Sequence, residues 1–158
     1  MNETPASLNR NRVHELRTEV RYAETDQMGF AHHSTAAVWF ELGRVGWLRE
    51  AGLCYRTLEA QGVLLPVVRL NVRYLAPARF EDPVVVQSRV IEVTRVRVAF
   101  ANRVLRQESG RWTVLAEGEV ELACVNRQGR PQRLPDKVQA TLAGLLCAGA
   151  WSDPKATG

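Results

Sequence analysis

Apolar and polar residues alternate along much of the chain, and this two-residue period predicts β-strands. Residues 15–22 place Leu16, Val20 and Tyr22 on one face and charged side chains on the other, as in a strand with one buried face. Four later segments show the same period or a β-branched composition: residues 68–75, 84–93, 96–104 and 112–124. Ser109-Gly110 predicts a tight turn between the last two.

One helix is predicted after the first strand, between Ser34 and Gly52. Its apolar positions recur every three or four residues and form two stripes instead of one. The stripes are Val38, Leu42, Val45 and Leu48, and Phe40, Gly43, Trp47 and Ala51. Because two stripes leave little of the circumference for water, we expect this helix to be largely buried. Either Ser34 or Thr35 can cap it by accepting a hydrogen bond from an unpaired backbone N–H of the first turn.

This order of elements predicts an α+β domain. Consecutive strands joined by short turns favour an antiparallel sheet, and the helix is expected to pack against one face of it. Because the helix is apolar almost all round, the sheet must curl around it. A short further helix is expected within residues 134–146, with Pro135 at its start. We assign residues 13–147 to a single domain, residues 1–12 to a mobile N-terminal tail and residues 148–158 to a loose C-terminal tail.

The composition is that of an ordinary globular domain, since 46% of the 158 residues are hydrophobic and 24% are charged. We find no apolar run that would predict a signal peptide or a membrane span. Cys54, Cys124 and Cys147 are too far apart to indicate a disulfide framework or a metal motif, so we expect a cytoplasmic protein. The net charge of +4 favours anionic ligands, but no stacking aromatics accompany the arginines, and no nucleic-acid partner is predicted.

Reactive side chains cluster in the loop before the helix, where Glu24, Asp26, His32 and His33 surround a turn-forming Gly29. Asp26 has two open interpretations, a carboxylate that bonds nearby backbone amides in a turn or one that acts in catalysis. A metal site would rest on clustering alone. Adjacent histidine side chains usually diverge, and no further ligand has suitable spacing, so we expect no metal.

The segment 22–33, YAETDQMGFAHH, resembles the active-site loop of the hotdog-fold acyl-CoA thioesterases, in the branch of 4-hydroxybenzoyl-CoA thioesterase and the YbgC-like proteins. The residues that match its motif are Asp26, Gly29, Ala31, His32 and His33. FELGR at 40–44 and YLAPARFED at 74–82 are similar to further family segments, in the same order. Ala31 stands where a valine is commoner, and Ala36 where an aromatic residue is frequent, so the acyl pocket is expected to differ.

The resemblance implies a hotdog fold, in which a curled sheet of about five strands wraps one long helix, and a thioester hydrolase without metal or organic cofactor. Asp26 would act as nucleophile or general base, and the backbone N–H of His33 would bind the oxyanion. Gly29 and His32 would contact the substrate. Arginines would hold the coenzyme A phosphates, and the candidates are Arg73, Arg79, Arg95 and Arg97. Glu41 is an alternative base, although we prefer an ion pair with Arg44.

The family also implies a homodimer, often paired again into a homotetramer, with active sites between subunits. An unpaired sheet edge is an independent physical reason for association. We therefore expect a homo-oligomer that acts on acyl-CoA and has no membrane partner. Two alternatives keep the fold and change the role: a non-catalytic acyl-CoA-binding module, and a dehydratase that acts on hydroxyacyl thioesters.

Overall fold

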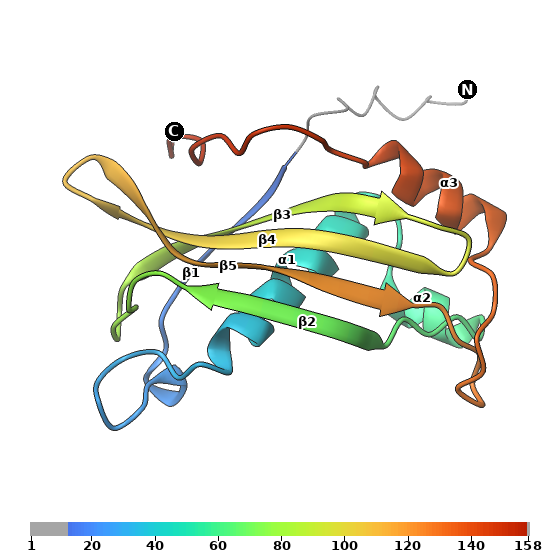
Figure 1. Cartoon of the computed structure of the whole chain (residues 1–158), viewed down its shortest axis with the longest axis horizontal. Helices are drawn as coiled ribbons and strands as arrows, with labels where there is room; N and C mark the ends of the chain where they lie inside the picture. The colour runs from blue at the N-terminus through green and yellow to red at the C-terminus, as the bar shows by residue number, and fades with distance from the viewer. Residues whose placement is uncertain (1–12, 158) are drawn as a thin grey trace.

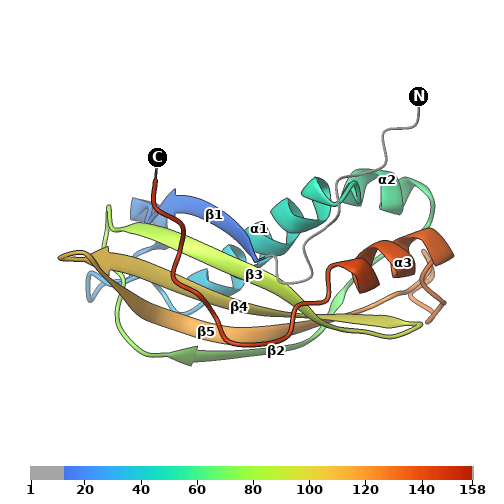
Figure 2. The ribbon, with the colours of Figure 1, turned by 90° about the horizontal axis from the view of Figure 1, so that it is seen from above.

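A computed structural model describes residues 13–157, which form a curled antiparallel sheet with one long helix against one face (Figure 1; Figure 2). The predicted N-terminal tail, residues 1–12, lies outside the described residues. The strands are β1 (His14–Glu19), β2 (Val67–Tyr74), β3 (Pro83–Val93), β4 (Arg97–Glu108) and β5 (Arg111–Ala123). The helices are α1 (Thr35–Glu50), α2 (Tyr55–Ala60) and α3 (Asp136–Gly144), and a short 3₁₀ turn lies at Tyr22–Glu24. The predicted α+β class and the five-stranded sheet are confirmed.

The strand order is β1-β3-β4-β5-β2, and every neighbouring pair is antiparallel. Strands β3, β4 and β5 follow one another in space as they do in sequence. Strand β2 instead crosses to the far side of β5 and pairs with no other strand of the described residues. Because β2 is an edge strand, Val68 and Leu70 stay 49% and 43% exposed.

The core lies between α1 and the inner face of the sheet. Phe40 and Trp47 of α1 are fully buried, and Phe100 of β4 is buried between its strand neighbours Val90 and Val120. Fully burying one such side chain stabilises the fold by roughly 1.5–3 kcal/mol, so this face of α1 holds the helix on the sheet. The first turn of α1 is thereby placed at a defined position beside the sheet.

The other stripe of α1 differs from the prediction. Val38 and Leu42 are each 44% exposed, although we expected a helix buried almost all round. The sheet covers one side of α1, and within the described chain the second stripe is left uncovered at Val38 and Leu42, whereas Leu48 of that stripe is fully buried. An apolar helix face and the apolar residues of edge strand β2 are thus left uncovered together.

Two local predictions at the N-terminal side are wrong. Tyr22 is 80% exposed instead of buried, because β1 ends at Glu19 and Tyr22 lies in the 3₁₀ turn. Ser34 occupies the N-cap position of α1, but neither its side chain nor that of Thr35 caps the helix. The Ser34 hydroxyl instead lies 2.8 Å from Nδ1 of His32, and the Thr35 hydroxyl donates to the main-chain oxygen of Glu24.

Helix α3 confirms the short helix predicted within residues 134–146, and Pro135 is its N-cap. Helix α2, in the segment before Gly62, was not predicted. The C-terminal segment runs back beside β3 and β4 and makes specific contacts there (Figure 1). The indole of Trp151 lies 4.1 Å from the guanidinium carbon of Arg89 and 4.9 Å from that of Arg103.

Candidate functional site

A tight loop precedes α1 and carries the candidate catalytic residues. The backbone N–H of Asp26 donates to the oxygen of Phe30 at 2.7 Å, and that of Gly29 donates to the oxygen of Asp26 at 3.0 Å. Gly29 has a φ of +82°, a value that side chains disfavour, so the turn requires glycine there. The loop is anchored at its far end, where the N–H of Ala31 donates to the oxygen of Ala78.

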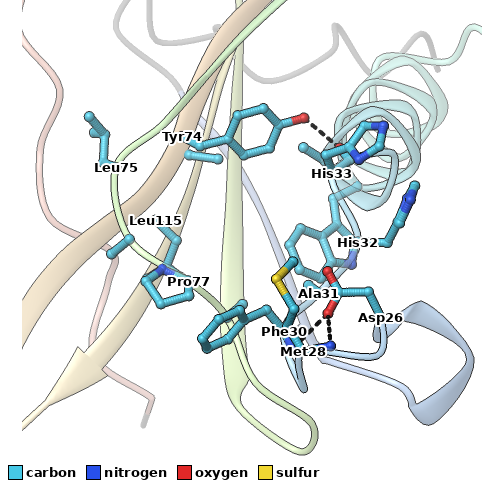
Figure 3. Close-up of a pocket in the computed structure, with 15 residues that line it drawn as sticks. Asp26, Met28, Phe30, Ala31, His32, His33, Tyr74, Leu75, Pro77 and Leu115 are labelled. Atoms are coloured by element: carbon cyan, nitrogen blue, oxygen red, sulfur yellow. Dashed lines mark hydrogen bonds between the residues drawn. The ribbon is translucent and has the colours of Figure 1, made fainter.

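The carboxylate of Asp26 is oriented by this turn. Its Oδ1 accepts hydrogen bonds from the backbone N–H groups of Met28 at 2.9 Å and Phe30 at 3.2 Å (Figure 3). Its Oδ2 has no hydrogen-bond partner among residues 13–157, and Asp26 lines a cavity. The carboxylate therefore has the bonds of a turn-forming aspartate and also a free oxygen for chemistry.

The turn that begins α1 supplies a free backbone donor. Ser34 N–H donates to His32 Nδ1 at 3.2 Å, and Thr35 N–H donates to the oxygen of His32 at 2.9 Å. The N–H of His33 has no acceptor within the described part of the chain. An unpaired N–H at the start of a sixteen-residue helix, where the helix dipole is positive, suits a developing negative charge.

The imidazoles of His32 and His33 lie against each other, with ring centroids 4.0 Å apart, whereas we expected adjacent side chains to diverge. Both residues are exposed. Among residues 13–157, no three histidine, cysteine or acidic side chains are grouped as metal ligands. His32 also accepts the Ser34 N–H bond, so its ring helps to shape the turn.

A cavity of about 390 Å³ opens between the loop, the start of α1 and the strand ends. Its wall is mostly apolar, which suits an acyl group, and its floor includes the buried Trp39. Ala31 and Ala36, the two departures from the family pattern, both line it. The remaining lining residues are Asp26, Met28, Phe30, His32, His33, Tyr74, Leu75, Ala76, Pro77, Ala78, Leu115 and Ala116.

The four candidate arginines do not lie together. Arg79 is beside the loop, with its guanidinium carbon 4.7 Å from the ring centroid of Phe30. Arg73 pairs with Glu117 at 3.5 Å and Arg97 with Glu121 at 2.5 Å, across neighbouring strands. Arg95 lines a separate cavity with Arg133, Leu134, Asp136 and Gln139.

Glu41 lies in a different cavity from Asp26, lined also by Arg44 and Tyr55. The distance from Glu41 Oε2 to Arg44 Nη2 is 3.5 Å, which fits the ion pair that we preferred. Burial raises the pKa of Tyr55, while the charge of Arg44 opposes that shift. Within one chain, Glu41 is therefore not placed to act beside Asp26.

The sequence pattern missed one polar residue of this site. Tyr74, which was predicted to lie on a strand face and begins the family-like segment 74–82 but was given no role, donates its hydroxyl hydrogen to the main-chain oxygen of His33 at 2.5 Å (Figure 3). No periodicity signals this contact, because 41 positions separate the two residues along the chain. The tyrosine ring also forms part of the cavity wall.

Comparison with known proteins adds independent support. The model of the thioesterase-like superfamily matches residues 20–142. The chain is 30% identical over 122 residues to the acyl-CoA thioester hydrolase YbgC of Escherichia coli, covering 77% of this chain and 89% of that protein. It is 44% identical over 70 residues to the putative acyl-CoA thioesterase YneP of Bacillus subtilis, which is 44% of this chain and about half, 51%, of that relative.

A solved structure agrees with the fold over most of the chain. A hypothetical protein of Thermus thermophilus superimposes with a TM-score of 0.78 at 40% identity, covering 87% of this chain and all of that one. The family match spans the loop, α1 and the whole sheet after β1. The chain therefore belongs to the thioesterase-like superfamily and is a thioester hydrolase of the hotdog fold.

Proposed function

We propose that this protein hydrolyses an acyl-CoA thioester to the free acid and coenzyme A, with Asp26 and the His33 backbone N–H as its catalytic groups. One observation carries the proposal: Asp26 and His33 line the same cavity, and each contributes an atom without a partner among residues 13–157. Hydrolysis of a thioester needs a negative group beside the carbonyl carbon and a donor beside its oxygen.

Two courses of reaction use these groups. As a base, Oδ2 of Asp26 takes a proton from water while the water oxygen attacks the carbonyl carbon. The tetrahedral oxyanion, held by the His33 N–H, then collapses and expels the coenzyme A thiolate, which recovers the proton. As a nucleophile, the carboxylate itself displaces the thiolate, and water hydrolyses the resulting anhydride. In both courses the bonds from Met28 and Phe30 to Oδ1 keep Oδ2 directed for attack.

The residues that line the cavity indicate the general class of the acyl group. The cavity is apolar and lined by several small residues, so a hydrocarbon or aromatic acyl group fits its chemistry. The named relatives YbgC and YneP act, or are thought to act, on acyl-CoA. Gly29 and His32 would lie against the substrate, and Arg79 would be the arginine nearest to it.

The active form would be a homodimer or a pair of dimers. One side of edge strand β2 pairs with no strand among residues 13–157, and Val38 and Leu42 on α1 are each 44% exposed. A second copy that pairs with β2 and covers these two residues would satisfy both features. Such a dimer would bring part of a second chain near each cavity.

No helix within residues 13–157 has the length and hydropathy of a membrane span. We propose a cytoplasmic location, because its three cysteines are free thiols and a reducing compartment keeps them so. Neither a nucleic acid nor a membrane is needed as a partner in this proposal.

A panel of short, long and aromatic acyl-CoAs, with released thiol measured, tests the activity. Asp26→Asn should fold and keep its Oδ1 hydrogen bonds, yet lose about a hundredfold or more in kcat, because the amide is neither base nor nucleophile. Glu41→Gln is the matched control, since it removes a carboxylate from the other cavity and should leave kcat unchanged.

The outcomes separate the alternatives. Binding of acyl-CoA without thiol release from any substrate would indicate a non-catalytic binding module. Release of an unsaturated acyl-CoA from a hydroxyacyl-CoA, detected by mass spectrometry, would indicate a dehydratase. Near-wild-type hydrolysis by Asp26→Asn would overturn the role of Asp26, and a loss in Glu41→Gln would transfer that role to Glu41.

A further inference from the structure

We propose that Tyr74 is a positioning residue of the reaction: its hydroxyl, by holding the carbonyl of His33, fixes the peptide group that follows the unpaired His33 N–H at the cavity. The inference rests on the proposed function, because it concerns the same oxyanion site. Nothing in the motif of the loop points to Tyr74, which comes from β2 at the opposite side of the cavity.

The turn that carries the His33 N–H is held by bonds among residues 32–35 and to the main-chain oxygen of Glu24, but in the described chain Tyr74 is the one strand residue whose side chain bonds to it. The side chain of Ser34 does not cap α1, and both His33 and Ser34 are exposed. The neighbouring amides are engaged with His32, but the main-chain N–H of His33 has no partner among the described residues. A free donor on an exposed turn is useful for catalysis only if the peptide groups beside it are held in place.

Tyr74 supplies that restraint. Its Oη lies 2.5 Å from the main-chain oxygen of His33, and it makes the only side-chain hydrogen bond from β2 to residues 32–34 in the described chain (Figure 3). The bond holds the His33–Ser34 peptide so that its carbonyl oxygen faces β2. If this peptide turned, the partial negative charge of the oxygen could face the substrate and oppose the developing oxyanion.

The bond also joins the catalytic turn to the rest of the fold. Tyr74 is the last residue of β2, and its neighbour Ala116 in β5 lines the same cavity. The position of the turn is therefore fixed relative to the sheet and not only relative to α1. Since Asp26 is held separately, by the amides of its own loop, Tyr74 governs the oxyanion side of the site.

Tyr74→Phe tests this, because it keeps the ring in the cavity wall and removes only the hydroxyl. We expect kcat to fall about tenfold with KM within twofold, since a displaced oxyanion donor weakens transition-state binding more than ground-state binding. The fall should be the same for short and aromatic acyl-CoAs. A cavity-wall role would instead change KM, and by an amount that depends on the acyl group.

Thr141→Val is the matched control. The Thr141 hydroxyl also donates to a main-chain oxygen, that of Lys137 at 2.8 Å, but it lies in α3 and does not line the cavity. This variant should hydrolyse acyl-CoA at the wild-type rate and have the wild-type melting temperature. Tyr74→Phe should have nearly the same melting temperature, which separates positioning from stability.

A second measurement does not depend on activity. The amide nitrogen of Ser34 shares a peptide group with the His33 carbonyl, so its ¹⁵N resonance reports the hydrogen bond. The Ser34 resonance should shift in Tyr74→Phe and keep its wild-type position in Thr141→Val. A moved resonance with an unchanged kcat, or an unmoved resonance, would overturn the inference. If wild-type protein hydrolyses no thioester, the proposed function fails while the resonance still tests the contact.

Discussion

Gly43 of α1 faces Ser88 of β3 so closely that a Cβ on Gly43 would lie 2.2 Å from the Ser88 hydroxyl oxygen. It would also lie 3.1 Å from Cγ1 of Val86. The Ser88 hydroxyl donates to Oδ1 of Asn102 at 2.8 Å, and both residues are buried. This glycine thus allows α1 to rest near the sheet, which in turn sets where the helix start and His33 lie.

Gly43→Ala should lower the free energy of unfolding by about 1–3 kcal/mol, the usual cost of an extra methyl group in a packed core. Chemical denaturation measures the change. Gly144→Ala is the control, because its added Cβ meets no atom within 4 Å, and it should leave the free energy of unfolding unchanged or slightly raised. If Gly43→Ala and wild type had equal free energies of unfolding, α1 would be able to move away from β3 at no cost in stability.

Arg79→Ala should raise KM for acyl-CoA more than it lowers kcat, the pattern of binding shared by ground and transition states. The effect should shrink for a truncated thioester that lacks the nucleotide. We expect smaller changes from Arg73→Ala and Arg97→Ala, because these side chains already pair with glutamates, and from Arg95→Ala, which lines another cavity. Unchanged KM in all four variants would assign these arginines to the solvated surface.

If the protein forms the proposed oligomer, Leu42→Glu should convert it to a monomer, because the glutamate places a charge beside Val38 on the exposed apolar part of α1. Light scattering at micromolar concentration measures the mass, and hydrolysis should fall with it if the cavity needs a second chain. Val96→Glu is the control, since Val96 is 37% exposed in the turn between β3 and β4. A wild-type protein that is monomeric would contradict the shared-site arrangement.

Cys54 should react with iodoacetamide before the other two cysteines. It is exposed, and the backbone N–H groups of Thr57 and Arg56 lower the pKa of its thiol, so more thiolate is present at neutral pH. Cys124 and Cys147 are buried, and burial raises the pKa of the Cys124 thiol. Peptide mass mapping over time measures the order, and Cys54→Ser should remove the fast phase. Equal rates at all three sites would contradict the packing around Cys124 and Cys147.

The elements of this fold were predictable because their signals are local. A two-residue period places side chains on alternate faces of a strand, and a three-to-four-residue period places them along a helix, whatever lies far away. This is why α1 and the five strands were predicted. The motif around Asp26 and Gly29 was also readable, because a tight turn is made by a few neighbouring residues.

The contacts between distant segments were not predictable in this way. Periodicity predicts that a helix face is apolar but not what covers that face, so all four residues of the second stripe of α1 were expected to be buried, whereas Val38 and Leu42 are exposed and only Leu48 is fully buried. The position of β2 beside β5 depends on pairing across the chain, and it alone brings Tyr74 to His33. The same pairing engages Arg73 with Glu117 of β5, the pairing of β4 with β5 engages Arg97 with Glu121, and Arg79 stays beside the loop. The secondary structure of a residue depends mainly on residues close to it in the sequence. Its tertiary contacts depend on how the sheet closes around the helix.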